Sequence, residues 1–259
     1  IEDIDAYFAT ATCESPHELV ALLILRGMAH LQLKEFGDAE RSLQSALRHD
    51  PDNAAIFQNL WFAASQQDKY ELAANWVEEL QRVAPEQLGT VKMRAVTYMT
   101  LKRPEQAEPA LQQWLKKAPR DAEALRYLCQ LRHQSGQHAE CLAALKRGLA
   151  AHPNDAVLLG MMTNVLATSP NTSIRNPQQA NEYLERYREV ETRRERVHYL
   201  QAIVLAANSD FDRAVAVLKE SLAKDVLSLK ERSQRESALS KLERNEKLLD
   251  DGSDSALNL

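Results

Sequence analysis

The sequence predicts an all-α fold, a solenoid of antiparallel helix pairs with no β-sheet. The 259 residues include only 7 glycines and 9 prolines, about half of the average usage, and the strong helix formers dominate the remainder. Four of the prolines recur every 34 residues, at Pro51, Pro85, Pro119 and Pro153. A fixed period of this length is typical of a repeat array, in which each repeat is one supersecondary unit.

Four segments of 34 residues, 20–53, 54–87, 88–121 and 122–155, align in one register. Their fourth and twenty-fourth positions are apolar, and their twentieth position is small, at Ala39, Ala73, Ala107 and Cys141. A small residue lets two helices cross closely in a packed core. The proline ends the second helix of each segment, because it lacks an N–H and clashes with the preceding turn. Each segment therefore predicts a helix, a turn and a second helix.

This pattern resembles the tetratricopeptide repeat, a 34-residue helix–turn–helix with the motifs W-x2-L-G-x2-Y, A-x3-F and P. In the first segment the matching residues are Gly27, Ala39-x3-Leu43, Ala46 and Pro51. The resemblance covers roughly residues 1–226. It implies a right-handed superhelix in which the first helix of every repeat lines a concave face.

Residues 1–19 are expected to form the second helix of a truncated repeat. Ile4, Phe8 and Ala11 are spaced four and three apart, which places them on one helical stripe. We expect this stripe to dock on the helix at 20–32. Because the first helix of that repeat is missing, we interpret the chain as a fragment of a longer protein.

Residues 20–155 hold the four regular repeats, and residues 156–226 predict two divergent ones. A loop insertion near 169–177 lengthens the turn of the first divergent repeat. Residues 227–249 are highly charged, with a thin apolar stripe at Ala238, Leu242 and Leu249. Terminal units of solenoids need a polar outer face, so this segment is expected to be a capping helix. The acidic residues 250–259 are expected to form a flexible tail.

Known catalytic motifs are missing from the sequence, which contains no Gly-rich phosphate loop, H-E-x-x-H, G-x-S-x-G or C-x-x-C. We therefore expect a protein that is not an enzyme and that holds no cofactor. The net charge of −5 argues against nucleic acid, whose readers are usually basic. No apolar run approaches the roughly 18–20 residues of a membrane span.

Cys129, His133 and Cys141 are the best candidates for metal ligands in the sequence, since zinc prefers such residues in tetrahedral sets. A fourth ligand is not evident, and the register directs His133 toward the groove, so the sequence predicts no metal. Cys129 and Cys141 fall at the eighth and twentieth positions, where paired helices cross. They are expected to be near neighbours, either as reduced thiols acting as small hydrophobes or as a disulfide, which would imply an oxidising compartment.

We expect a protein–protein interaction module that binds a peptide segment or a partner domain in its concave groove. The resemblance places ten side chains in that groove: Gln58, Phe62, Lys92, Met99, Arg126, Gln130, His133, Asn164, Arg196 and Tyr199. Their chemistry favours an acidic and apolar segment as partner. The C-terminal tail of a chaperone is not expected as partner. Some tetratricopeptide domains bind the carboxylates of such tails through five side chains, and at best two of the five equivalent positions here are basic.

Two alternatives remain open. The chain is alternatively the recruiting or regulatory arm of an enzyme whose catalytic domain lies outside this sequence, or a scaffold that assembles with itself. The compartment is also open, with the cytoplasm slightly favoured.

Overall fold

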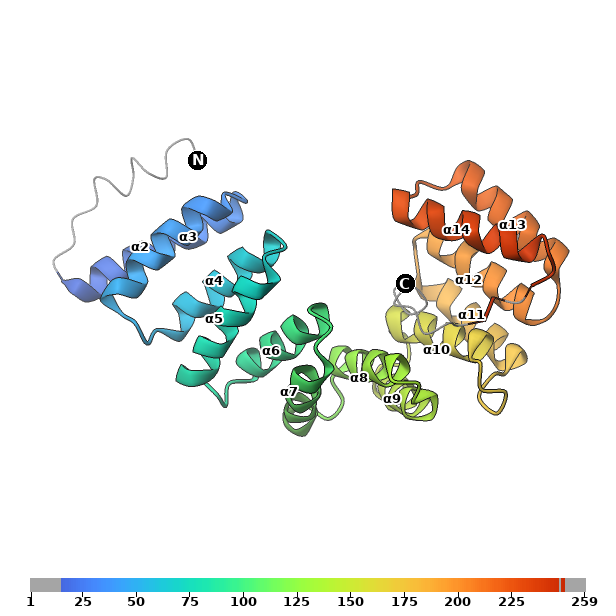
Figure 1. Cartoon of the computed structure of the whole chain (residues 1–259), viewed down its shortest axis with the longest axis horizontal. Helices are drawn as coiled ribbons and strands as arrows, with labels where there is room; N and C mark the ends of the chain where they lie inside the picture. The colour runs from blue at the N-terminus through green and yellow to red at the C-terminus, as the bar shows by residue number, and fades with distance from the viewer. Residues whose placement is uncertain (1–14, 247, 250–259) are drawn as a thin grey trace. The chain divides into compact units, whose positions relative to one another are not determined.

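The computed structural model describes residues 15–246, 248 and 249, and within them it contains thirteen α-helices and no strand (Figure 1). The predicted all-α solenoid of helix pairs is thereby confirmed. The expected helix within residues 1–19 falls largely outside the described residues, as does the tail at 250–259. None of the described helices combines the length and apolarity that crossing a membrane requires.

The chain divides into two compact units, Ile1–Lys117 and Ala118–Leu259. The described helices of the first unit are α2 (Pro16–Gln32), α3 (Phe36–His49), α4 (Ala54–Gln66), α5 (Tyr70–Val83), α6 (Leu88–Thr100) and α7 (Pro104–Lys117). They form three pairs, and each second helix also contacts the first helix of the following pair within the unit.

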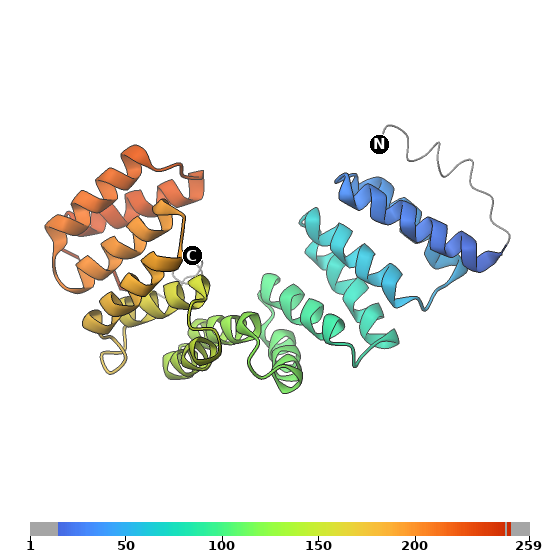
Figure 2. The same ribbon diagram turned by 180° about the vertical axis from the view of Figure 1, so that it is seen from behind.

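The second unit repeats this arrangement (Figure 2). Its helices are α8 (Ala122–Gln134), α9 (His138–Ala151), α10 (Ala156–Thr168), α11 (Pro177–Val190), α12 (Arg194–Ala207), α13 (Phe211–Lys224) and α14 (Leu229–Leu242). Three pairs are again present, and the unpaired helix α14 packs on α13.

Helix α2 begins at Pro16, four residues before the first regular repeat was expected to start. The Ser15 side chain accepts a hydrogen bond from the Glu18 N–H, and Pro16 at the first helical position has no N–H that would need a partner. These two residues therefore move the start of the helix toward the N-terminus.

The turn inside most pairs contains one residue with a left-handed backbone. At the fifteenth position of their repeats, Lys34, Asp68, Lys102, Gly136 and Ser209 have φ between +55° and +72°. The following N–H then bonds to a carbonyl five residues earlier, as Glu35 does to His30 at 2.9 Å, which closes the first helix. Four of these five residues carry a Cβ that disfavours this conformation.

The loop between α10 and α11 replaces that turn. Its Ile174 is buried, and the Asn176 N–H donates to the Leu166 carbonyl at 2.8 Å. The Asn176 side chain then caps α11 by accepting from the Gln179 N–H. The insertion is thus anchored to the core and does not simply project from it.

The C-terminal helix is shorter than expected, since α14 ends at Leu242 and not at residue 249. Asn245 has a φ of +58°, and the Glu246 N–H bonds to the Lys241 carbonyl, which is the closure seen in the other turns. Ala238 and Leu242 are buried in a cluster with residues of α12 and α13, whereas Leu249 is exposed. Only the first two residues of the expected stripe therefore pack.

The close crossing inside a pair is clearest in α2 and α3. A Cβ added to Gly27, at the eighth position, would lie only 2.7 Å from the Leu43 side chain. In the next pair Trp61 occupies that position, and its indole N–H donates to the Thr97 hydroxyl at 2.7 Å. Trp114, at another position where small residues are usual, is fully buried, as expected for an indole that fills core space.

We predict that Lys34→Gly stabilises the protein by about 0.5–1 kcal/mol, because glycine removes the left-handed strain and loses part of that gain to the flexibility of the unfolded chain. The reverse change at the equivalent turn, Gly136→Ala, should lower stability by about 1 kcal/mol. Urea unfolding followed by circular dichroism measures both. Equal effects of the same sign would contradict the role assigned to these turns.

We also predict that Gly27→Ala lowers the free energy of unfolding by about 1–3 kcal/mol, because the new methyl group overpacks against Leu43. Gly37→Ala is the matched control, since nothing lies within 4 Å of its added Cβ. That helical substitution should be neutral or stabilising by up to about 1 kcal/mol. Thermal unfolding of both variants beside wild type makes the comparison.

Candidate functional site

The ten residues assigned to the groove all lie on the first helices of their pairs. Those of the first unit are Gln58 and Phe62 on α4, and Lys92 and Met99 on α6. Those of the second unit are Arg126, Gln130 and His133 on α8, Asn164 on α10, and Arg196 and Tyr199 on α12. Their surroundings differ sharply, and this decides which can reach a partner.

Three of the ten are not at the surface. Met99, His133 and Asn164 are only 8%, 3% and 1% exposed, so their assignment to an open groove was wrong. His133 faces the paired helix, where its ring lies 5.2 Å from that of His138. Helix α10 is enclosed because α8, α9, α11 and α12 all contact it, and every residue from 158 to 168 is buried.

Three exposed apolar side chains lie on two neighbouring first helices of the first unit. Phe62 is 42% exposed, and Met28 and Leu25 on α2 are 43% and 56% exposed. Helices α2 and α4 contact each other. The two α2 residues are not among the predicted groove residues, although Met28 and Phe62 share the ninth position of their repeats. We call Leu25, Met28 and Phe62 the unit 1 patch.

The first unit also contains a lysine whose ammonium group is held in place by an aromatic ring. The Lys92 ammonium lies 4.8 Å from the centre of the Trp114 ring, within the range of a cation–π interaction. Because Trp114 is fully buried, the ring is fixed and restricts where the ammonium can lie. Lys92 itself stays half-buried.

Tyr98 shows how the first unit uses its other polar side chains. Its hydroxyl donates to Glu78 at 2.6 Å, and burial together with this bond raises the pKa of Tyr98 to about 12. Arg94 lies 3.7 Å from the same carboxylate. A phenol held protonated in this way ties α6 to α5 and is not suited to exchange protons with a substrate.

The polar groove residues of the second unit are largely engaged within the protein. The Arg126 guanidinium lies 4.5 Å from the ring centre of Tyr127 and 3.7 Å from Glu123. Arg196 lies 3.9 Å from Glu191. These contacts leave less free charge on this surface than the sequence suggested.

Tyr199 is part of the contact that holds the C-terminal helix. Arg235 of α14 is buried, lies 5.3 Å from the ring centre of Tyr199, and donates to the Glu195 carbonyl at 2.6 Å. Burial lowers the pKa of Arg235, although a guanidinium remains charged at neutral pH. A buried, bonded arginine therefore fastens α14 to α12.

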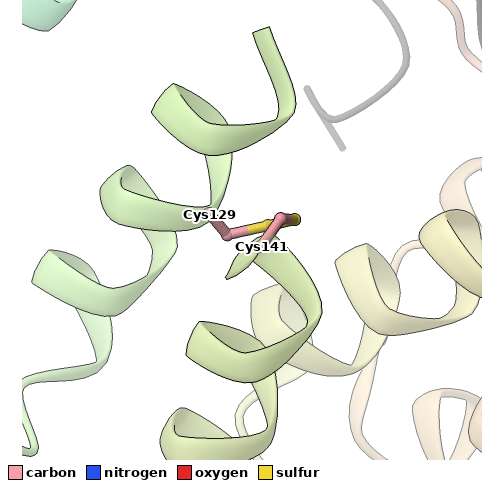
Figure 3. The surroundings of a disulfide bond; sticks show 2 residues. All are labelled: Cys129 and Cys141. Atoms are coloured by element: carbon pink, nitrogen blue, oxygen red, sulfur yellow. A yellow bond between two sulfur atoms is a disulfide. The ribbon is translucent and has the colours of Figure 1, made fainter. Parts of the chain in front are cut away.

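The two described cysteines are joined. Cys129 of α8 and Cys141 of α9 form a disulfide with their Cα atoms 3.8 Å apart, and Figure 3 shows their side chains meeting between the two helices. The expected proximity is confirmed, and of the two states left open the structure contains the disulfide, not the reduced thiols. Among the described residues there is no group of three or more His, Cys, Asp and Glu side chains placed to hold a metal.

Comparison with known families and structures agrees with this architecture. Two family models, each described as tetratricopeptide repeat, match residues 98–165 and 173–225. No curated protein matches the sequence significantly.

Several solved structures share the fold. A tetratricopeptide repeat protein from Parabacteroides merdae has a TM-score of 0.67 at 17% identity, with 93% of this chain and 90% of that chain covered. PilF of Pseudomonas aeruginosa has a TM-score of 0.67 at 17% identity, with 86% of this chain and 99% of that chain covered. YrrB is described as having an unusual peptide-binding site. It has a TM-score of 0.56 at 18% identity, with 68% of this chain and 88% of that chain covered. At these identities the likeness shows the fold alone.

We predict that Arg235→Ala detaches the C-terminal helix, with a loss of about 1.5–3 kcal/mol for the charged hydrogen bond. Hydrogen exchange should speed up in α12 and α14 and stay unchanged in the first unit. Lys230→Ala, at an exposed position of α14, is the control. Exchange rates that rise equally in both variants would refute a special role for Arg235.

Proposed function

The chain is a tetratricopeptide repeat protein, and from this premise we propose that it recognises a protein segment with apolar and acidic residues on the first helices of its first unit. Repeats of this kind generally serve protein–protein interaction and are generally not catalytic, because stacked helix pairs build extended binding surfaces. The fold does not by itself give the partner, so the proposal rests on the side chains present.

The unit 1 patch is the observation that carries the proposal. Its three large apolar side chains stand exposed on neighbouring helices, although burying each would gain roughly 1.5–3 kcal/mol. Apolar side chains gathered on one face commonly mark a binding surface. Aromatic residues such as Phe62 are common in the buried centre of such interfaces.

Lys92 supplies the polar part of the recognition. Its ammonium is placed by Trp114, so less side-chain freedom is lost when a carboxylate binds it. An extended segment with aliphatic side chains for the patch and a carboxylate for Lys92 fits this chemistry. Arg126 and Gln130 offer a smaller polar surface on the second unit, to which we assign a secondary role.

Two features support a peptide over the other candidates. YrrB, a protein of the same fold, is described as having a peptide-binding site. Among the described residues of this chain, polar side chains such as Tyr98 and Arg196 are tied to structural partners, which does not favour catalysis within these repeats.

Selection from a display library of short random peptides tests the proposal. We expect the full chain to enrich peptides with aliphatic and acidic residues. Phe62→Ala should weaken a selected peptide by about 2 kcal/mol or more, roughly 30-fold, and Lys92→Ala by about 1–3 kcal/mol. Isothermal titration calorimetry measures both changes. The fold should persist, because Phe62 is already exposed.

Leu229→Ser is the matched control, since Leu229 is an exposed apolar residue on the second unit. It should leave the affinity unchanged. Enrichment of basic peptides, or equal loss in all three variants, would refute the proposal. If light scattering shows oligomers that Phe62→Asp dissociates, the patch serves self-assembly and the scaffold alternative holds.

A further inference from the structure

The first helices of the first unit carry little negative charge. Helix α4 contains no charged residue, and α6 contains Lys92 and Arg94 but no acid. The only acid on α2 is Glu18, in its first turn. The whole chain has a net charge of −5, so this row of helices differs from the rest of the molecule. A segment that carries carboxylates can therefore approach it without strong repulsion.

The unit 1 patch and Lys92 lie on three neighbouring helices. Helices α2 and α4 contact each other, and the Trp61 indole of α4 donates to the Thr97 hydroxyl of α6 at 2.7 Å. The axes of packed helices are about 8–10 Å apart. A ligand that crosses these helices in turn thus meets the positive charge on α6 first and the apolar side chains of α4 and α2 after it.

Residues 250–259, outside the described part of the chain, have the composition that this row of helices favours. Their sequence, DDGSDSALNL, contains three aspartates, three aliphatic residues and no lysine or arginine. Glycine and serine are weak helix formers, so the sequence favours an extended ligand. Residues 1–14 are also acidic and apolar, but Ile4, Phe8 and Ala11 recur there at helical spacing, which predicts a helix.

The order and spacing of the side chains in this segment also fit. An extended chain advances about 3.3 Å per residue, so it reaches the next helix after about three residues. Asp254 and Leu257 are three residues apart, and Leu259 follows two residues later. If the aspartate lies at α6, the two leucines come to α4 and α2.

We infer that residues 250–259 of a second copy of this chain bind the first unit. Asp254 pairs with Lys92, and the two leucines cover the unit 1 patch. The inference rests on the proposed function, because it names the segment that this surface recognises. The segment follows the second unit and its binding surface lies on the first, so the contact is heterologous and joins copies head to tail. Recognition and self-assembly are then the same event.

The experiment titrates a labelled peptide of residues 250–259 with the full chain carrying Leu257→Ser and Leu259→Ser, whose own segment no longer competes. Fluorescence anisotropy measures the dissociation constant. We expect saturable binding that Phe62→Ala weakens roughly 30-fold. Leu229→Ser, which changes an exposed apolar residue of the second unit, is the matched control and should leave the binding unchanged.

A double-mutant cycle tests the charged pair. Lys92→Ala in the protein and Asp254→Asn in the peptide should each weaken binding about 10-fold. Together they should weaken it no more than either change alone, because both remove the same contact. Asp250→Asn in the peptide is the control and should bind like the parent peptide. Fully additive losses would overturn the inference.

Light scattering tests the role of the second copy. The mass of the wild-type protein should rise with concentration, and that of the Leu257→Ser/Leu259→Ser chain should not. Equal binding of a scrambled peptide, tighter binding of a peptide of residues 1–14, or a wild-type monomer at every concentration overturns the inference. If library-selected peptides still bind through Phe62, only this inference fails. If they do not, the proposed function fails as well.

Discussion

Two helices of a pair can approach closely only where at least one of them presents a very small side chain, and this steric limit underlies the other features of the fold. In α2 and α3 the Leu43 side chain fills the space beside Gly27. The missing side chain on one helix therefore leaves room for a larger one on the other. The same complementarity recurs between pairs, where Gly148 of α9 receives the Leu158 side chain of α10. Close packing of this kind transmits the register from one repeat to the next.

Equivalent repeat positions have different surroundings in the two units. In the first unit, the ninth position carries Met28 and Phe62, which remain exposed. In the second unit, that position is held by Gln130, which is half-buried, and by Asn164, which is buried within α10, and Tyr199 joins the contact with Arg235. Polar side chains of the second unit thus hold its own helices together, whereas apolar side chains of the first unit remain exposed. This difference is the reason why we propose the partner surface on the first unit.

The fold could be predicted because the constraint repeats. Prolines and small residues recur at fixed spacing, and each has one steric meaning wherever it occurs. The surface could not be predicted as well, because exposure depends on what packs above a position. Met99 and His133 share the twelfth position, and both are buried, whereas Lys92 is half-buried on the same helix as Met99. The repeat register determines where each residue lies on its helix, but it does not determine which neighbouring side chains cover that residue.

The sequence left the state of the two cysteines at the α8–α9 crossing open for a related reason. Cysteine satisfies the size limit almost as well as alanine, so a cysteine pair there looks like packing. One turn away along α8, the turn at Gly136 brings His138 back to His133, and the two rings are in contact. The left-handed residue that closes α8 therefore also sets the distance between the two rings. The tight crossing thus brings the two cysteines together, and the turn that completes the repeat brings the two histidines together.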